Sequence, residues 1–313
     1  MLSRRHLRTR VMQALYSWYQ SEDKNTEGTI GELFRGAERT YDLYLSLLQV
    51  LPELADEEDR YYADLPPRHI MKEGVVLTKL SNNLFIHFLQ TDSTFNEGLK
   101  KRKISWQKDS ELIKKVFFQL RNSAEYKEYI SVAEHTPQQD VDFCTWIYKH
   151  TILTSEALQN AMEEKNIWWA EALDLINSMV IKTIKIAHPD KKGHFELMPL
   201  FRDEEEDKEF IEILFRETVK NDSYFEQLIS DKTKNWDVER IALMDIILLK
   251  MALTEILYFP GIPIKVSINE YIDISKDFST PKSKVFINGV IDNLVADLKA
   301  LGAVKKSGRG LIE

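Results

Sequence analysis

The sequence has very little of what stabilises secreted proteins or anchors membrane proteins. Cys144 is the only cysteine in 313 residues, which excludes an internal disulfide and a cysteine-based zinc site. No uninterrupted apolar run approaches the roughly 18 to 20 residues that cross a bilayer. Gln13 and Ser17 interrupt the segment where a signal peptide would need an apolar centre. We therefore expect a cytoplasmic protein of a reducing compartment, without a membrane partner.

Glycine and proline are also scarce, and the familiar catalytic motifs are missing. With 11 glycines and 9 prolines the composition suits a helical protein better than a β-sandwich. There is no glycine-rich phosphate loop, no G-x-S-x-G, no H-E-x-x-H and no pair of cysteines. The tripeptide His188-Pro189-Asp190 matches a J-domain signature over three residues only, and adding His194 still leaves a metal site incomplete. We expect no enzymatic activity, no metal and no cofactor.

The net charge of -8 by itself argues against binding to nucleic acid, but the charge is unevenly distributed along the chain. Residues 1–21 contain four arginines and no acidic residue, whereas residues 22–205 carry a formal charge of -9 and residues 206–313 carry -3. Attraction to phosphate is screened within about 10 Å at ordinary salt concentrations. A small basic face can therefore bind RNA within an acidic protein.

The most apolar stretch predicts a central helix from Val238 to Leu257. Its few charged residues point in different directions around a turn of 3.6 residues, so the helix must be surrounded by other helices. Asp237 is the predicted N-cap. The segment Phe259-Pro260-Gly261-Ile262-Pro263 ends the helix, because two prolines and a glycine prevent its continuation.

Two further amphipathic helices are predicted after this break. The first runs from about Ile264 to Asp277, and Ser279-Thr280-Pro281 ends it. Thr280 suits the N-cap of the following helix and Pro281 its first position. The apolar stripe of that last helix reaches Leu301. Three apolar helices joined by short turns predict a compact bundle.

Three segments of the sequence resemble one known family. They are Ile262-Pro263-Ile264-Lys265-Val266-Ser267-Ile268-Asn269-Glu270, Val285-Phe286-Ile287-Asn288-Gly289-Val290-Ile291-Asp292 and the arginine-rich start Ser3-Arg4-Arg5-His6-Leu7-Arg8-Thr9-Arg10. They are similar to the transcription antitermination factors of the NusB family. The resemblance implies an all-α, NusB-like helical bundle with two small helical subdomains. We expect residues 1–21 and 206–304 to form this RNA-binding core, residues 22–205 a large helical insertion, and residues 305–313 a basic flexible tail.

The insertion departs from the family pattern and is predicted to be helical throughout. Proline, glycine and an acidic run mark His188 to Asp207 as the linker back to the core. The predicted helices lie near Thr29–Leu54, Ile70–Phe88, Ser110–Arg121, Pro137–His150 and Ile167–Ala187.

The candidate RNA-binding residues lie near both ends of the chain. Arginines at the start of a helix oppose the positive end of its dipole, and contact with RNA phosphates explains their presence. Lys282 and Phe286 are four residues apart, which would place a cation beside an aromatic ring for a phosphate and an unstacked base. The alternative is that Phe286 is a core residue. The resemblance implies a surface for boxA-type RNA at the matching positions, which are Arg4, Arg5, Arg8, Tyr16 and Phe286.

Two positions depart from the family pattern. Lys282 stands where the family often has an acidic residue, and His6 stands where an arginine is common, which leaves the contact details open. Asp245 lies within the apolar helix and needs a partner if it is buried. The resemblance implies that Asp245 binds a partner, and a structural cap or an internal salt bridge is the alternative.

The resemblance also implies what the protein does. The expected partners are a boxA-like single-stranded RNA, the ribosomal protein NusE and the transcription elongation complex, acting in ribosomal RNA transcription. Two alternatives remain at this point. One is a helical protein-interaction scaffold that works through the insertion, and the other is a stand-alone relative of the NusB-like domain of RNA cytosine methyltransferases.

Overall fold

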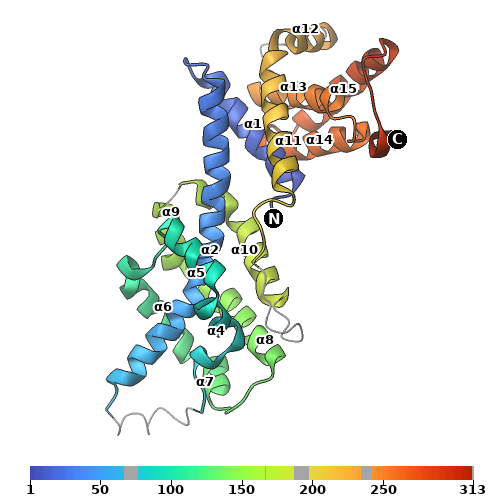
Figure 1. Ribbon diagram of the computed structural model, residues 1–313. Helices are drawn as coiled ribbons and strands as arrows, with labels where there is room; N and C mark the ends of the chain where they lie inside the picture. Colours follow the sequence, from blue (N-terminus) through green and yellow to red (C-terminus); the bar gives the residue numbers. More distant parts are fainter. Residues whose placement is uncertain (67–76, 166, 187–196, 234–240, 312–313) are drawn as a thin grey trace. The chain divides into compact units, whose positions relative to one another are not determined.

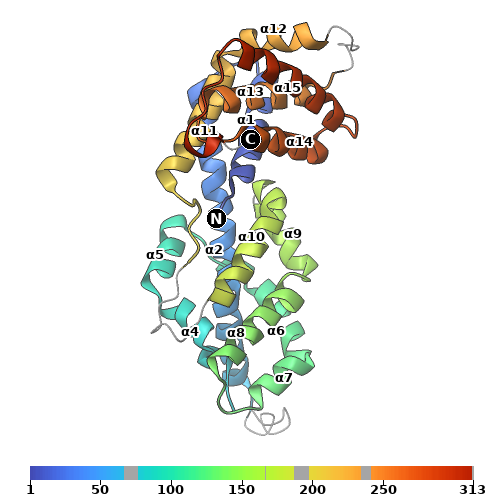
Figure 2. The same ribbon diagram turned by 90° about the vertical axis from the view of Figure 1, so that its right-hand side faces the viewer.

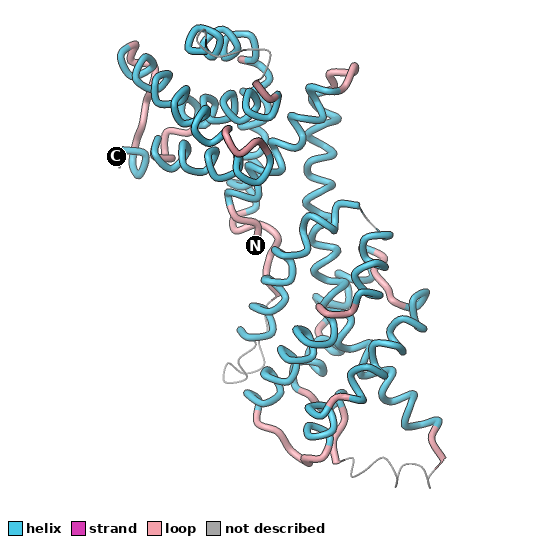
Figure 3. Tube along the Cα trace, turned by 180° about the vertical axis from the view of Figure 1, so that it is seen from behind, coloured by secondary structure: helices cyan, strands magenta, loops and turns pink. Residues whose placement is uncertain are grey.

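The computed structural model describes residues 1–66, 77–165, 167–186, 197–233 and 241–311. Within these ranges the regular structure is entirely helical and contains no strand (Figure 3), which confirms the predicted all-α fold. The chain divides into two compact units. Unit 1 comprises residues 1–35 and 201–313, and unit 2 comprises residues 36–200.

Unit 1 is built around the apolar helix α13 (Leu243–Tyr258). Its residues from Ile247 to Ile256 are all buried, including the charged Lys250 and Glu255. Five helices pack on α13 (Figure 1), namely α1 (Arg4–Gln20), α11 (Glu204–Lys220), α12 (Asp222–Thr233), α14 (Ile264–Phe278) and α15 (Ser283–Ala300). This arrangement confirms that the apolar helix is surrounded by other helices.

Two helices of unit 1 begin later than the sequence predicted. Helix α13 starts at Leu243 rather than Val238, with Ala242 as its N-cap, and Asp237 lies outside the described residues. Thr280 does not cap α15, because residues 281 and 282 form a turn before the helix starts at Ser283. The Thr280 hydroxyl instead lies 2.8 Å from that of Ser283.

The C-terminal segment is not a loose tail in the part of it that the structure describes. Lys306 Nζ donates a hydrogen bond of 2.9 Å to the carbonyl of Phe259, and Ser307 N donates one of 3.0 Å to the carbonyl of Pro260. The chain then forms the 3-10 turn η5 (Gly308–Leu311). A Cβ added to Gly310 would lie 1.9 Å from the Pro260 oxygen, so only glycine fits there. The expected flexible tail is corrected, because the Lys306 side chain and the Ser307 backbone donate hydrogen bonds to the carbonyls between α13 and α14.

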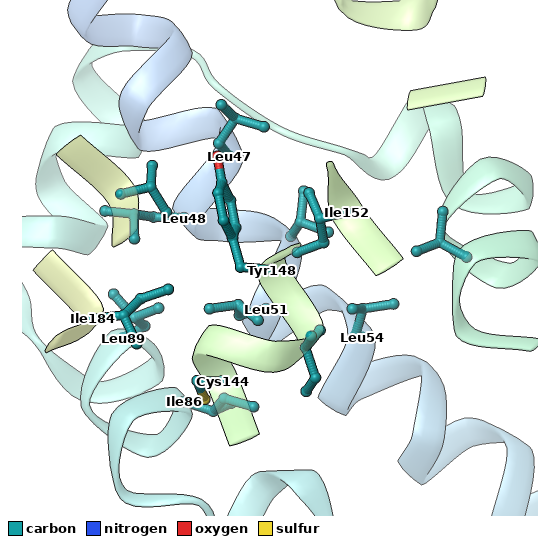
Figure 4. Close-up of a cluster of buried hydrophobic side chains, with 14 of the residues drawn as sticks. Leu47, Leu48, Leu51, Leu54, Ile86, Leu89, Cys144, Tyr148, Ile152 and Ile184 are labelled. Carbon is teal, nitrogen blue, oxygen red and sulfur yellow. The ribbon is translucent and has the colours of Figure 1, made fainter. Parts of the chain in front are cut away.

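Unit 2 has a hydrophobic core of its own. Leu47, Leu48, Leu51 and Leu54 of the long helix α2 pack against side chains of later helices (Figure 4), which are Ile86, Leu89, Cys144, Tyr148, Ile152 and Ile184. The elements that contribute to unit 2 (Figure 2) are α2 (Thr26–Asp64), η1 (Leu80–Asn82), α4 (Leu84–Thr91), α5 (Ser93–Arg102), η2 (Gln107–Asp109), α6 (Ser110–Asn122), α7 (Ala124–Ile130), α8 (Pro137–Ile147), the π-helical turn η3 (Tyr148–Ile152), α9 (Glu156–Lys165) and α10 (Ile167–Ile186).

Several helix ends in and after the insertion differ from the predictions. Helix α2 continues to Asp64 and contains Pro52, although the apolar spacing had ended at Leu54. The helix predicted near Ile70–Phe88 lies partly outside the described residues. Within the described part, α4 starts only at Leu84, and the side chain of Asn83 caps it. The acidic run assigned to the linker instead starts α11. Its carboxylates suit the positive end of the helix dipole, and Asp203 is the N-cap.

Candidate nucleic-acid interface

The arginine-rich helix α1 begins with a capping box and without any acidic residue. The Ser3 hydroxyl accepts a hydrogen bond from the backbone of His6, and the ring of His6 accepts one from the backbone of Ser3. The first turn contains no carboxylate, so the arginines meet the helix dipole without local compensation. Their counter-charges come from α11, α13 and α14.

Arg8 is a buried structural residue and cannot reach RNA phosphate. Its Nε and Nη2 donate hydrogen bonds of 2.7 and 2.8 Å to the two carboxylate oxygens of Glu255, a bidentate pair. Burial alone would lower the pKa of Arg8, but the hydrogen bonds and the charge of Glu255 raise that pKa above its ordinary value. The side chain is 4% exposed. The expectation that Arg8 contacts RNA is therefore wrong, because Glu255 holds it inside unit 1.

Glu255 is at the centre of this buried network. It also accepts hydrogen bonds from the hydroxyls of Ser267 and Tyr271, at 2.7 and 3.0 Å. Burial, followed by the charge of Glu255, raises the pKa of the Tyr271 hydroxyl well above its ordinary value. The network joins α1, α13 and α14. Sequence reasoning missed Glu255, although a carboxylate within an apolar helix signals that a cation must be buried beside it.

Arg4 and Arg5 are also paired, but both remain partly exposed. Arg5 lies 3.0 Å from a carboxylate oxygen of Glu270 and 2.8 Å from one of Asp273, and its side chain is 47% exposed. Arg4 lies 3.3 Å from Asp207 and stacks over Phe210. Hydrogen bonding to Glu270 is the main reason why the pKa of Arg5 is raised. These arginines can meet a phosphate only from their open sides, with their carboxylate partners close by.

Phe286 does not provide an exposed ring. It is 6% exposed and belongs to the buried stripe of α15 with Ile287, Val290 and Leu294. Lys282 precedes the helix, so the expected cation and ring on one helical face do not form. The exposed apolar residue at this point is Val285. The correct interpretation was the core one, and the spacing of Phe286, Val290 and Leu294 was the signal for it.

Three exposed side chains remain as candidates beside the arginines. Tyr16 on α1 is 40% exposed. Lys282 and Lys284 are exposed at the start of α15, and neither makes an ion pair with another described residue. Sequence reasoning missed Lys284. Helices α1 and α15 both pack on α13 and α14, which therefore position both groups of candidates.

Asp245 is a buried structural residue. Its two carboxylate oxygens accept hydrogen bonds of 2.6 Å from Ser279 Oγ and 2.8 Å from Ser283 Oγ. It is 5% exposed and fastens the turn between α14 and α15 to α13. The prediction that Asp245 contacts a partner is therefore corrected to a structural role, because both carboxylate oxygens accept hydrogen bonds from serine hydroxyls inside unit 1.

The described residues offer neither a metal site nor a membrane-spanning helix. They contain no group of histidine, cysteine and carboxylate side chains that could hold a metal ion. His188 and His194, weighed as metal ligands, lie outside the described residues. Among the described helices, none is long and apolar enough to cross a membrane.

Comparison with known proteins identifies the family. The model of the NusB family matches residues 170–296, starting within α10. The transcription antitermination protein NusB of Natranaerobius thermophilus is 32% identical over 113 residues, which are 36% of this chain and 81% of the relative. This chain belongs to the NusB family. No solved structure matches it.

Two other NusB proteins are more similar over a smaller share of their length. The transcription antitermination protein NusB of Salinibacter ruber is 48% identical over 105 residues, or 34% of this chain and 66% of the relative. That of Chloroherpeton thalassium is 39% identical over 106 residues, or 34% of this chain and 50% of the relative. The chain thus spans about half to two thirds of these NusB relatives, and each match covers about a third of the chain.

Proposed function

We propose that this protein is a transcription antitermination factor that binds boxA-like single-stranded RNA together with the ribosomal protein NusE. The complex would act on the transcription elongation complex in the cytoplasm, chiefly during ribosomal RNA transcription. The observation that carries the proposal is membership of the NusB family through relatives named transcription antitermination proteins. No chemical step is required of the protein.

Unit 1 provides the two kinds of side chain that single-stranded RNA needs. Lys282 and Lys284 offer uncompensated charge for phosphates, and Tyr16 offers an exposed ring on which a base can stack. Arg5 contributes positive charge but shares it with Glu270 and Asp273. In this proposal Tyr16 takes the stacking role that the sequence had assigned to Phe286.

The experiment measures binding of a fluorescently labelled boxA-type RNA by anisotropy, with and without NusE, over a range of salt concentrations. For a single strand the slope of log affinity against log salt is about 0.7 per phosphate contacted. Replacing both Lys282 and Lys284 by alanine should lower that slope by about 1.4. Tyr16→Leu should cost about 1–3 kcal/mol of binding free energy and leave the slope unchanged.

Arg5→Ala tests the arginine helix. It should lower the slope by about 0.7, and the freed carboxylates of Glu270 and Asp273 should weaken binding further by repelling phosphate. Lys220→Ala is the matched control, because Lys220 is 71% exposed on α11 and outside the candidate surface. Absence of RNA binding both with and without NusE would overturn the proposed function. An unchanged slope in the lysine and arginine variants would remove these residues from the interface.

A further inference from the structure

A second basic surface lies on unit 2, where α5 ends and the chain turns towards η2. We call it the lysine corner, and it consists of the exposed Lys100, Lys101, Lys103 and Lys108. Among the described residues, none of these four lysines makes an ion pair or a side-chain hydrogen bond. The corner is a local positive surface within residues 22–205, which carry a net charge of -9.

Three carboxylates near the corner are neutralised by other cations. Arg102 Nη1 lies 2.6 Å from Asp42 and Nη2 lies 2.5 Å from Glu38, both on α2. Lys165 lies 2.6 Å from Asp109. These ion pairs hold the corner in place and neutralise Glu38, Asp42 and Asp109. The four exposed lysines make no ion pair with another described residue, although Glu97 lies one helical turn before Lys100 and Lys101 on α5.

The backbone at Lys103 is in a conformation that a lysine rarely adopts. Its φ of 56° and ψ of 36° are left-handed, and it is the only non-glycine residue with positive φ in the described part of the chain. Its amide closes the end of α5 by donating to the carbonyls of Leu99 and Lys100. Glycine ordinarily fills this position because a Cβ is unfavourable there.

Helix capping explains only part of this arrangement. The negative end of the α5 dipole accounts for Lys100 and Lys101 in the last turn. It does not account for a strained Lys103 where glycine would be better, nor for Lys108 beyond the helix. A strained residue at a surface position is a reason to look for a function there.

We propose that the lysine corner binds the phosphate backbone of single-stranded RNA. The lysine ammonium group is a compact charge on a flexible stem, which suits binding to a phosphate group. No large apolar side chain between residues 93 and 110 is exposed, so the corner lacks the apolar centre of a typical protein interface. The inference rests on the proposed function, because it assigns unit 2 a second contact with the same kind of RNA.

The main test uses the full chain and two RNAs, a short boxA-type element and the same element with single-stranded flanks. In one variant all four corner lysines become glutamine. In the matched control four other exposed lysines of unit 2 become glutamine, namely Lys127, Lys149, Lys182 and Lys185. With the flanked RNA the corner variant should lower the salt slope by up to about 2.8, whereas the control should change it little.

The two proposals fail in different ways. If the wild-type protein binds neither RNA, with or without NusE, the proposed function fails. If it binds them and the corner variant has the wild-type slope on both, or loses no more than the control does, the lysine corner is not an RNA site. A salt slope for the flanked RNA that falls in the corner variant and not in the control variant supports the inference.

Lys103→Gly separates binding from folding within one residue. Glycine relieves the left-handed strain, so the midpoint of urea denaturation should rise. Removing one cation should lower the salt slope by about 0.7. Raising the salt concentration from about 50 to about 200 mM should then cost the variant about 2.6-fold less affinity than it costs the wild-type protein. A variant that is more stable and yet binds the flanked RNA more weakly supports the proposal. A more stable variant with unchanged binding would show that Lys103 only ends the helix.

Discussion

Replacing Arg8 by alanine tests whether this arginine is part of the fold or of the RNA interface. The variant leaves the carboxylate of Glu255 buried beside Ser267 and Tyr271, without its cation. Breaking a buried ion pair by removing one partner costs about 3–5 kcal/mol. The two hydroxyls that remain on Glu255 favour the lower end of this range. We expect the free energy of unfolding of unit 1 to fall by about 3 kcal/mol.

The assay is urea denaturation of the full chain, with hydrogen exchange of α13 amides to assign the loss to unit 1. Arg4→Ala is the control from the same helix. Its partly exposed ion pairs should contribute about 1 kcal/mol or less. The double variant Arg8→Met with Glu255→Gln should recover much of the stability, because no charge is then left buried.

RNA binding supplies the second readout for Arg8. If Arg8 is structural, the folded fraction of Arg8→Ala should bind RNA with the wild-type salt slope, because no phosphate contact has been removed. A loss of stability below about 1 kcal/mol, combined with a slope reduced by about 0.7, would refute the reasoning.

Three further predictions follow from buried groups. Burial raises the pKa of Glu58 to about 7 from 4.5, with Tyr126 and the Leu80 amide as its hydrogen-bond donors. This shift in pKa corresponds to about 3 kcal/mol of stability, which should be present below pH about 4.5 and lost as pH rises through about 7. Urea denaturation across this pH range should show that the free energy of unfolding depends less on pH in Glu58→Gln than in the wild-type protein. Asp245→Ala leaves two serine hydroxyls without their acceptor and should cost about 1–3 kcal/mol in the same assay; an unchanged stability would contradict the structural role of Asp245. Phe286→Leu should cost about 1.5 kcal/mol or less and leave RNA affinity unchanged, whereas Phe286→Ala should cost about 3–5 kcal/mol; RNA affinity lost in a stable Phe286→Leu protein would restore the stacking role.

The lysine corner changes how the large insertion can be viewed. Unit 2 has its own core and its own buried polar groups, so it is a folded unit rather than a long loop. If the corner contacts RNA, unit 2 extends the interface of a NusB-family protein to RNA beyond the short element. The lysines of the corner cost unit 2 little folding stability, because they lie on the surface and because the ion pairs of Arg102 and Asp109 hold the corner in place.

Local patterns determined the parts of the fold that depend on neighbouring residues. The apolar spacing after Pro263 predicted a helix from Ile264 to Asp277, and the structure has one to Phe278. Side chains three and four residues apart share a helix face, so the sequence alone carries this information. The start of α13 at Leu243 was missed, because an apolar run does not by itself mark where the first helical hydrogen bond forms.

Only the tertiary structure decided which charged and aromatic residues are available to a partner. Arg8 and Glu255 are 247 positions apart, and no local pattern relates them. Their burial removes one arginine from a run that looks uniformly exposed in the sequence, and the packing of α15 within unit 1 hides Phe286. The sequence therefore determined the helices and the family resemblance, whereas long-range packing determined which side chains remain on the surface, since burial depends on contacts between segments far apart in the chain.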